Sequence, residues 1–240
     1  RPSGQRIARA PRVGLYQPWT ANMDEGWTRW VLETHAIPYT TLHDADVTGG
    51  KLADVDVLLV PDMTPRQMKA GMSARAVPAE YAGGLGDAGI GRIRAFVENG
   101  GRLVLLDRAS QLAPELGVAA TVVTPAGRGG EEGEPAAAPG AATGAATPRA
   151  ERPYAPGSIL RTLVDGRHPL AAGMADTAAV YFTNSTTLDV RGVPGASAVL
   201  RYPAAADAVL MSGYLSGAGA IAGKTALAVA PAGRGDVVLF

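Results

Sequence analysis

The chain has 240 residues, of which 47% are apolar, and its 22 basic and 22 acidic side chains give a net charge of zero. A neutral chain lacks the basic surface that nucleic acid or an anionic membrane attracts, and no apolar run reaches the roughly 20 residues of a membrane-spanning helix. The absence of cysteine excludes disulfides, thiolate metal sites and cysteine nucleophiles.

The two ends of the sequence indicate a piece of a longer polypeptide. The chain begins at Arg1 rather than methionine, and it ends on an apolar, strand-like run at 237–240. We therefore expect any targeting segment to lie upstream and the C-terminal cut to fall inside the fold. Residues 1–11 are basic and contain proline, and we expect them to form a loose arm before a single domain over 12–240.

Strands and helices alternate in the first half of the chain. One amphipathic helix is expected to begin at Asn22 or Asp24 and to end near Thr34. A second is expected to begin with Asp87 as its cap and to end at Asn99, which two glycines follow. Four runs are expected to form strands: Arg12–Tyr16, Tyr39–Leu42, Val55–Val60 and Arg102–Leu106. Of these, Arg12–Tyr16 is expected to be buried, and Val55–Val60, apolar apart from Asp56, to be covered on both faces. The rest of this half is expected to form a loop over 62–84, a helical turn over 109–116 and a strand over 118–123.

The composition changes at residues 125–150. This stretch is made mostly of alanine, glycine, proline and threonine with acidic residues, and it has almost no large apolar side chain. Such a composition cannot offset the entropy of ordering, so we expect a disordered insertion there. The chain that follows reads mostly as strands, at 159–164, 180–183, 198–202 and 209–212, with a terminal hairpin over 225–230 and 236–240.

This alternation predicts an α/β fold with a mainly parallel sheet covered by helices, plus a strand-rich C-terminal part. In such sheets the ligand crevice lies outside the carboxyl ends of the strands. That rule gathers six polar or aromatic residues into one candidate crevice: Gln17, Trp19, His43, Asp62, Asp107 and Arg108.

All three tryptophans fall within a dozen residues of the first half. Trp27, Trp30 and Val31 have helical spacing, and we expect them to pack the first helix against the sheet. Trp19 follows a proline at the carboxyl end of the first strand, where the crevice is expected. It either contacts a ligand or partner, or packs within its own loop.

Metal binding is not expected in this chain. A catalytic zinc site needs nitrogen and carboxylate ligands together, and His43-Asp44-Ala45-Asp46 is the only cluster of this kind. We interpret it as a polar strand end, with Asp44 or Asp46 capping the next turn. His35 suits a helix C-terminus, and His168 lies in a turn.

The segment Gly100–Ala113 has the order strand, sharp turn, helix start, on which α/β enzymes mount a nucleophile. It resembles the G-x-C-x-G-x-Q-L elbow of class I glutamine amidotransferases. Alignment on Gln111 and Leu112 puts Asp107 at the cysteine position. A carboxylate cannot form the thioester that glutamine hydrolysis needs, so glutaminase chemistry is excluded. Ser110 lies beyond the turn and has no evident histidine partner.

A second resemblance covers most of the chain outside 125–150. The run Val13–Trp30 resembles the start of the amidotransferase-like domain that follows the catalytic domain in certain bacterial zinc carboxypeptidases. Four further segments also fit that pattern: 39–46, 59–62, 100–109 and 167–174. The resemblance implies a flavodoxin-like fold, an extracellular or periplasmic metallopeptidase, and zinc held by H-x-x-E and a distant histidine. This chain has no H-x-x-E, so the zinc is expected in a catalytic domain upstream of Arg1.

Three functions remain open. The first is a non-catalytic accessory domain that contacts the upstream peptidase domain, its peptide substrate or an envelope glycan, with a crevice filled by side chains. The second is a binding module for a sugar or amino acid, which needs an open pocket there. The third is a cryptic hydrolase, which needs His43 within hydrogen-bond reach of Asp107. We expect Asp107 to cap the following helix and Arg108 to pair with a surface acid.

Overall fold

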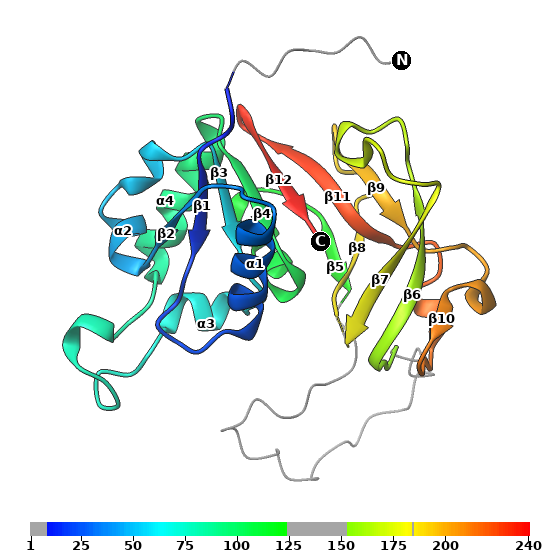
Figure 1. Cartoon of the computed structure of the whole chain (residues 1–240), viewed down its shortest axis with the longest axis horizontal. Coiled ribbons are helices and arrows are strands. Elements are labelled where there is room, and N and C mark those ends of the chain that lie inside the picture. The colour runs from blue at the N-terminus through cyan, green and yellow to red at the C-terminus, as the bar shows by residue number, and fades with distance from the viewer. Residues whose placement is uncertain (1–8, 124–152, 184) are drawn as a thin grey trace, which may run out of the picture. The chain divides into compact units, whose positions relative to one another are not determined.

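The computed structural model describes residues 9–123, 153–183 and 185–240 (Figure 1). The predicted insertion at 125–150 and residues 1–8 of the predicted arm lie outside the described residues.

The chain divides into two compact units. The first contains residues 1–119, 193–195 and 229–240, and the second contains residues 120–192 and 196–228. The single domain expected over 12–240 stays a prediction.

The first unit is built on a parallel sheet with the strand order β12-β4-β3-β1-β2. All four pairings between these neighbours are parallel. Leu15, Leu58 and Leu103, which lie on three adjacent strands, are fully buried, as expected where helices cover both faces. The strands are β1 (Val13–Tyr16), β2 (Tyr39–Leu42), β3 (Val57–Val60), β4 (Arg102–Leu105) and β12 (Gly235–Leu239).

Four α-helices accompany this sheet: α1 (Met23–Thr34), α2 (Asp44–Thr48), α3 (Pro65–Ala70) and α4 (Gly86–Glu98). Asn22 is the N-cap of α1, and its Oδ1 accepts from the Glu25 N–H at 2.9 Å. The expectation that Asp87 caps the next long helix is wrong, because Leu85 is the N-cap residue and Asp87 lies inside the first turn of α4. There Asp87 still meets the positive end of the helix dipole.

The predicted loop over 62–84 contains α3. Thr64 and Gln67 form a capping box, in which each side chain binds the backbone N–H of the other residue, and Pro65 occupies the first helical position. The loop then closes on itself through a bridge between Met72 and Gly83. At Gly71, where φ is +55°, a Cβ would lie 1.7 Å from the Gly83 carbonyl oxygen, so only glycine fits this crossing.

Three 3₁₀ segments complete the first unit: η1 (Lys51–Asp54), η2 (Ala79–Tyr81) and η3 (Asp107–Leu116). Ion pairs hold the segment that precedes β1 against Asp56, the residue before β3. The Asp56 carboxylate accepts from the guanidinium groups of Arg9 and Arg12 and from the Arg12 N–H. These hydrogen bonds hold the pKa of Asp56 well below its usual range.

The second unit is strand-rich and mainly antiparallel, with β6 paired to β7, β9 and β10. Its core includes Leu160, Phe182, Leu200 and Tyr202, which come from β6, β7, β9 and the chain just after β9. Its strands are β5 (Thr121–Val123), β6 (Pro156–Val164), β7 (Thr177–Thr183), β8 (Thr187–Asp189), β9 (Ser197–Arg201) and β10 (Leu210–Ser212). Strand β11 (Thr225–Ala232) begins in this unit, and from Val229 onward its residues belong to the first unit.

The structure confirms the predicted fold class, an α/β fold of the flavodoxin type with a strand-rich C-terminal part. The 3₁₀ turn η4 (Pro169–Ala171), with His168 as its N-cap, is the turn expected around His168. The short strand β8 and the 3₁₀ turns η5 (Ala206–Ala208) and η6 (Ala218–Ala220) were not expected from the sequence. No helix in the described part of the chain has the length and apolar character that crossing a membrane requires.

Candidate functional site

The carboxyl ends of β1, β3 and β4 lie around a small open pocket of about 120 Å³. The loop after β1 and the start of α1 supply most of its wall, and the ends of β3 and β4 supply Asp62 and Arg108. This volume holds several water molecules or a small polar molecule. The lining residues are Pro18, Thr20, Ala21, Asn22, Met23, Asp24, Asp62, Met63, Gln67 and Arg108.

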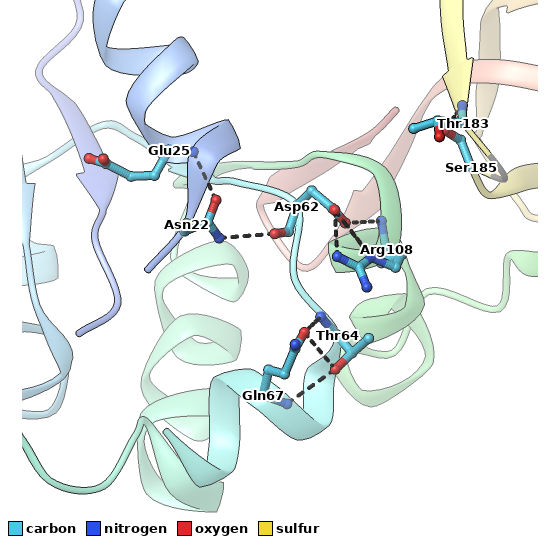
Figure 2. A network of polar contacts seen from close by, with 8 residues as sticks. All are labelled: Asn22, Glu25, Asp62, Thr64, Gln67, Arg108, Thr183 and Ser185. Atoms are coloured by element: carbon cyan, nitrogen blue, oxygen red, sulfur yellow. Dashed lines mark hydrogen bonds and ion pairs between the residues drawn. The ribbon is translucent and has the colours of Figure 1, made fainter. Parts of the chain in front are cut away.

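Asp62 and Arg108 form the central charged pair of this pocket (Figure 2). The Arg108 Nε donates to both oxygens of the Asp62 carboxylate, at 2.9 and 3.1 Å, and one terminal nitrogen donates to Oδ2 at 2.7 Å. The Arg108 backbone N–H adds a fourth contact at 3.0 Å. A bidentate guanidinium–carboxylate pair of this kind is both strong and directional.

The expected partner of Arg108 is therefore corrected. The sequence analysis predicted a surface acid, whereas the Asp62 side chain is only 12% exposed and belongs to the crevice itself. The two residues are 46 positions apart, Asp62 in the loop after β3 and Arg108 in η3 after β4, and the parallel register of β3 and β4 brings them together.

Around this pair, Asn22, which was expected only as a possible helix cap, and Gln67, which was not singled out from the sequence, line the pocket (Figure 2). The Asn22 amide nitrogen donates to the Asp62 carbonyl at 3.0 Å, so the cap of α1 is tied to the end of β3. Gln67 uses its amide oxygen to accept from the Thr64 N–H and hydroxyl. The T-P-x-Q sequence at 64–67 carried the capping-box signal that would have found this residue.

Asp107 occupies the turn between β4 and η3 with φ at +46°. Its N–H donates to the Phe240 carbonyl at 2.6 Å. A left-handed conformation at a non-glycine residue is strained and is found at functional turns, including the nucleophile elbow. The predicted cap is wrong in its geometry, since Leu106 is the N-cap of η3 and Asp107 is its first residue.

The backbone at Asp107 leads to a stability prediction. Aspartate, asparagine and glycine tolerate a positive φ, whereas a β-branched side chain does not. We expect Asp107→Asn to change the free energy of unfolding little, and Asp107→Val to lower it by about 1–2 kcal/mol. Urea unfolding measures both variants. Ala36→Gly, at φ +51° outside the pocket, calibrates the effect of relieving a positive φ; a valine at 107 with unchanged stability would contradict the expectation.

Ser110 is not available as a substitute nucleophile. It is fully buried, and its hydroxyl lies 3.2 Å from the Leu105 carbonyl and 3.3 Å from the Phe240 carbonyl, to which it can donate. The hydroxyl therefore ties η3 to the ends of β4 and β12.

Trp19 and His43 form a separate aromatic cluster. Their rings are stacked at 3.9 Å with an interplanar angle of 6°, and Tyr81 packs edge-on against Trp19 at 4.8 Å. The His43 Nδ1 lies 2.8 Å from the Gln17 carbonyl oxygen. Because a carbonyl only accepts, this nitrogen carries the proton. The Trp19 ring thus packs against His43 and Tyr81 and remains 40% exposed.

The six predicted crevice residues therefore fall into three groups: Gln17, Trp19 and His43 in the aromatic cluster, Asp62 and Arg108 in the pocket, and Asp107 at the elbow. The cryptic hydrolase needed a hydrogen bond between His43 and Asp107. Among the described residues, the His43 ring bonds to the Gln17 carbonyl and its backbone N–H to the Asp46 carboxylate. The geometry does not supply the base that this hypothesis requires.

Next to the aromatic cluster lies a pair formed by the buried Tyr16 and the partly buried Asp44. The Tyr16 hydroxyl donates to the Asp44 carboxylate at 2.6 Å. Burial raises the pKa of Asp44 above its ordinary value, and the hydrogen bond from Tyr16 opposes that shift. Burial and the nearby carboxylate together raise the pKa of Tyr16 far above its ordinary value. The pair fastens β1 to α2 and lies outside the pocket lining.

Within the described residues, no group of three or more histidine or carboxylate side chains is placed to hold a metal ion. His43 is committed to the Gln17 carbonyl, and the His168 Nδ1 accepts from the Leu170 N–H in a turn. His35 is the C-cap residue of α1, where a histidine was expected.

The expected packing of Trp27 and Trp30 is wrong. Both side chains point away from the sheet and are 58% and 57% exposed, while Glu25 and Leu32 are the buried residues of α1. Glu25 is paired with Arg29, whose guanidinium also donates to the hydroxyls of Tyr39 and Thr41 on β2. The polar pair therefore takes the inward face of the helix that the tryptophans were expected to fill.

Solved structures with the same fold show what the chain is similar to. A ThuA-like protein from Bacteroides uniformis superposes with a TM-score of 0.53 at 9% identity, covering 100% of this chain and 84% of that one. A cytoplasmic protein from Salmonella typhimurium gives 0.52 at 12%, covering 96% and 86%. A glutamine amidotransferase from Thermotoga maritima gives 0.51 at 10%, covering 96% and 75%.

At these identities the similarity establishes a fold of the ThuA-like and class I amidotransferase type, and the fold alone. No protein-family model matches the sequence, and no curated protein sequence matches it either.

Proposed function

We propose that this chain is an amidotransferase-like domain without catalytic activity of its own. The observation that carries the proposal is Asp107, which stands in the strained turn between β4 and η3 where the resembling enzymes have their cysteine. An aspartate there keeps the backbone of the elbow and lacks the thiol that forms the thioester.

The neighbouring residues support the same proposal. Arg108, the arginine among the described residues that line the pocket, makes three guanidinium hydrogen bonds and one backbone hydrogen bond to the Asp62 carboxylate, which neutralises its charge. The Ser110 hydroxyl is buried against two carbonyls, and the His43 ring is held by Gln17. A nucleophile and a base within reach of each other are the minimum for acyl transfer, and these residues do not provide them.

The role that we propose is that of an accessory domain in a secreted or periplasmic zinc carboxypeptidase. This part rests on the resemblance of Val13–Trp30 and four further segments to such domains. The zinc ion and its H-x-x-E ligands would belong to a catalytic domain on the same polypeptide. The accessory domain would then contact that catalytic domain, the peptide substrate or an envelope glycan.

The test is an assay of the purified 240-residue chain for glutamine hydrolysis and for zinc-dependent release of C-terminal residues from peptides. We expect no turnover above the rate of a chain carrying Asp107→Asn, which keeps the turn and removes the carboxylate charge. Turnover that Asp107→Asn abolishes would make Asp107 catalytic and would overturn the proposal. Zinc-dependent peptide cleavage by the unaltered chain would overturn it too.

A second function has one observation in its favour. The pocket beside Asp62 is open, whereas a purely structural accessory domain was expected to fill its crevice with side chains. It offers two carboxylates, a hydroxyl and two amides next to two methionines, a combination suited to a small sugar or amino acid. The substitutions at Arg108 in the Discussion distinguish a structural charge pair from a binding one.

A further inference from the structure

The outer face of α1 carries an apolar stripe, made of Met23, Trp27, Trp30 and Val31. Their exposed fractions are 74%, 58%, 57% and 46%. At 3.6 residues per turn these four positions fall within an arc of about 100°, which is the width of a helix face that normally packs against protein. The two indole rings contact each other edge to face at 5.9 Å, so they form one continuous surface.

Helix α1 also has a separate face that packs against the sheet, so the apolar stripe is not its buried face. The inward face exists and is formed by Glu25, Arg29 and Leu32, with the ion pair bound to β2 through Tyr39 and Thr41. The sequence thus places charge inside and its largest apolar side chains outside. Such an arrangement favours a partner for the outer face, because contiguous exposed apolar surface on a protein marks interaction sites.

The area of the stripe fits a pairing of two copies. A tryptophan offers up to about 250 Å², so the two indoles alone expose roughly 280 Å². With Met23 and Val31 the stripe reaches the roughly 300–600 Å² of the largest patch on a typical protein surface. Two copies that meet through the same stripe bury about twice that area, which approaches the roughly 1,000 Å² of a specific interface.

We propose that the stripe is a self-association surface, through which two copies of this chain pair their α1 helices antiparallel about a two-fold axis midway between Trp27 and Trp30. Antiparallel helices place opposite ends of their dipoles together. In this register Asp24 of one copy lies level with Glu33 of the other, and because nine residues turn the helix by about 180°, these two acids lie on opposite sides of the contact. The two Asp24 carboxylates are then nine positions apart, roughly 13 Å, which exceeds the screening length of about 8 Å at physiological salt.

The rest of the chain is compatible with this pairing. The net charge of zero creates no long-range repulsion between copies. Of the charged groups on α1, Arg29 is occupied by Glu25, and Glu33 accepts from the Tyr39 hydroxyl. The centre of the contact is therefore aromatic and its rim is polar, which is the usual anatomy of a stable interface.

Sedimentation equilibrium of the 240-residue chain tests the proposal. We expect a dimer with a dissociation constant in the micromolar range, and we expect Trp27→Ser with Trp30→Ser to weaken it at least about tenfold. Tyr181→Ser, at an aromatic residue of β7 that is 67% exposed, is the matched control and should leave the dimer intact. Far-UV circular dichroism confirms that each variant is folded.

Single-cysteine variants test the register, since the natural chain has no cysteine. With oxidised glutathione as the oxidant, a mixture of Met23→Cys and Thr34→Cys chains should form the mixed disulfide in preference to either symmetric one. A monomer at 200 μM (roughly 10–100 times the expected dissociation constant) would overturn the proposal. It would also be overturned by a dimer that the tryptophan variants leave unchanged, or by preferential Met23→Cys symmetric cross-linking.

Discussion

Replacement of Arg29 by methionine is expected to destabilise the chain by about 3 kcal/mol, the largest effect of any single substitution that we propose. Glu25 faces the sheet and is 5% exposed, and Arg29 is its ion-pair partner one turn further along α1. Methionine fills much of the same volume but leaves the carboxylate buried without its opposite charge. The free energy of unfolding in urea measures the loss.

The chain contains a matched control for this substitution. Arg94 and Glu98 form the same kind of pair, four positions apart on a helix, with side chains about half exposed. Arg94→Met should therefore lower the free energy of unfolding by no more than about 0.5 kcal/mol. The double variant Glu25→Leu with Arg29→Met removes both buried charges and should recover most of the loss. Equal effects of Arg29→Met and Arg94→Met would show that Glu25 is solvated.

Helix α1 also shows where sequence reasoning reached its limit. Its start at Asn22 and its end near Thr34 were predictable, because a capping side chain and a fall in apolar periodicity are local signals. Which face of the helix packs against the sheet was not predictable. A stripe of tryptophans predicts a core face by its hydrophobicity. The opposite face is the buried one because Arg29, the ion-pair partner of Glu25, donates to the hydroxyls of Tyr39 and Thr41 on β2.

The sheet was more predictable than its connections. Strands β1, β3 and β4 are largely apolar runs, which is the pattern of strands covered on both faces, whereas the edge strand β2 has two threonines among its four residues. The strand β8, at Thr187–Asp189, has three residues and little apolar character, so it carries no such pattern. Its place depends on pairing with β5 and β11, which is a tertiary contact.

The candidate site divides in the same way. That Asp62, Asp107 and Arg108 end neighbouring strands follows from topology, and the sequence analysis grouped them for that reason. It could not predict that Asp62 binds Arg108, because a residue 46 positions away gives no local signal. The positive φ of Asp107 is also a tertiary effect, in which the N–H must reach the Phe240 carbonyl at the end of the chain.

Replacement of Arg108 by leucine is expected to lower the free energy of unfolding by about 2–3 kcal/mol. The Asp62 carboxylate is 12% exposed, so it would keep most of its desolvation cost and lose three of its four hydrogen bonds. Arg108→Lys keeps a cation but loses the fork that binds both oxygens, and we expect a loss of about 1 kcal/mol. A double-mutant cycle with Asp62→Asn should give a coupling energy above about 1 kcal/mol.

The sign of the Arg108→Leu effect decides between the two functions that the pocket allows. A charge pair that serves the structure stabilises the fold, and its loss lowers the free energy of unfolding. A charge pair that is kept for a ligand is held at a cost, since the loss of hydration of two charges can exceed the energy of their mutual attraction. If Arg108→Leu leaves the chain as stable as before or more so, the pocket at Asp62 is a binding site, and ligand recognition replaces the accessory role as the leading function.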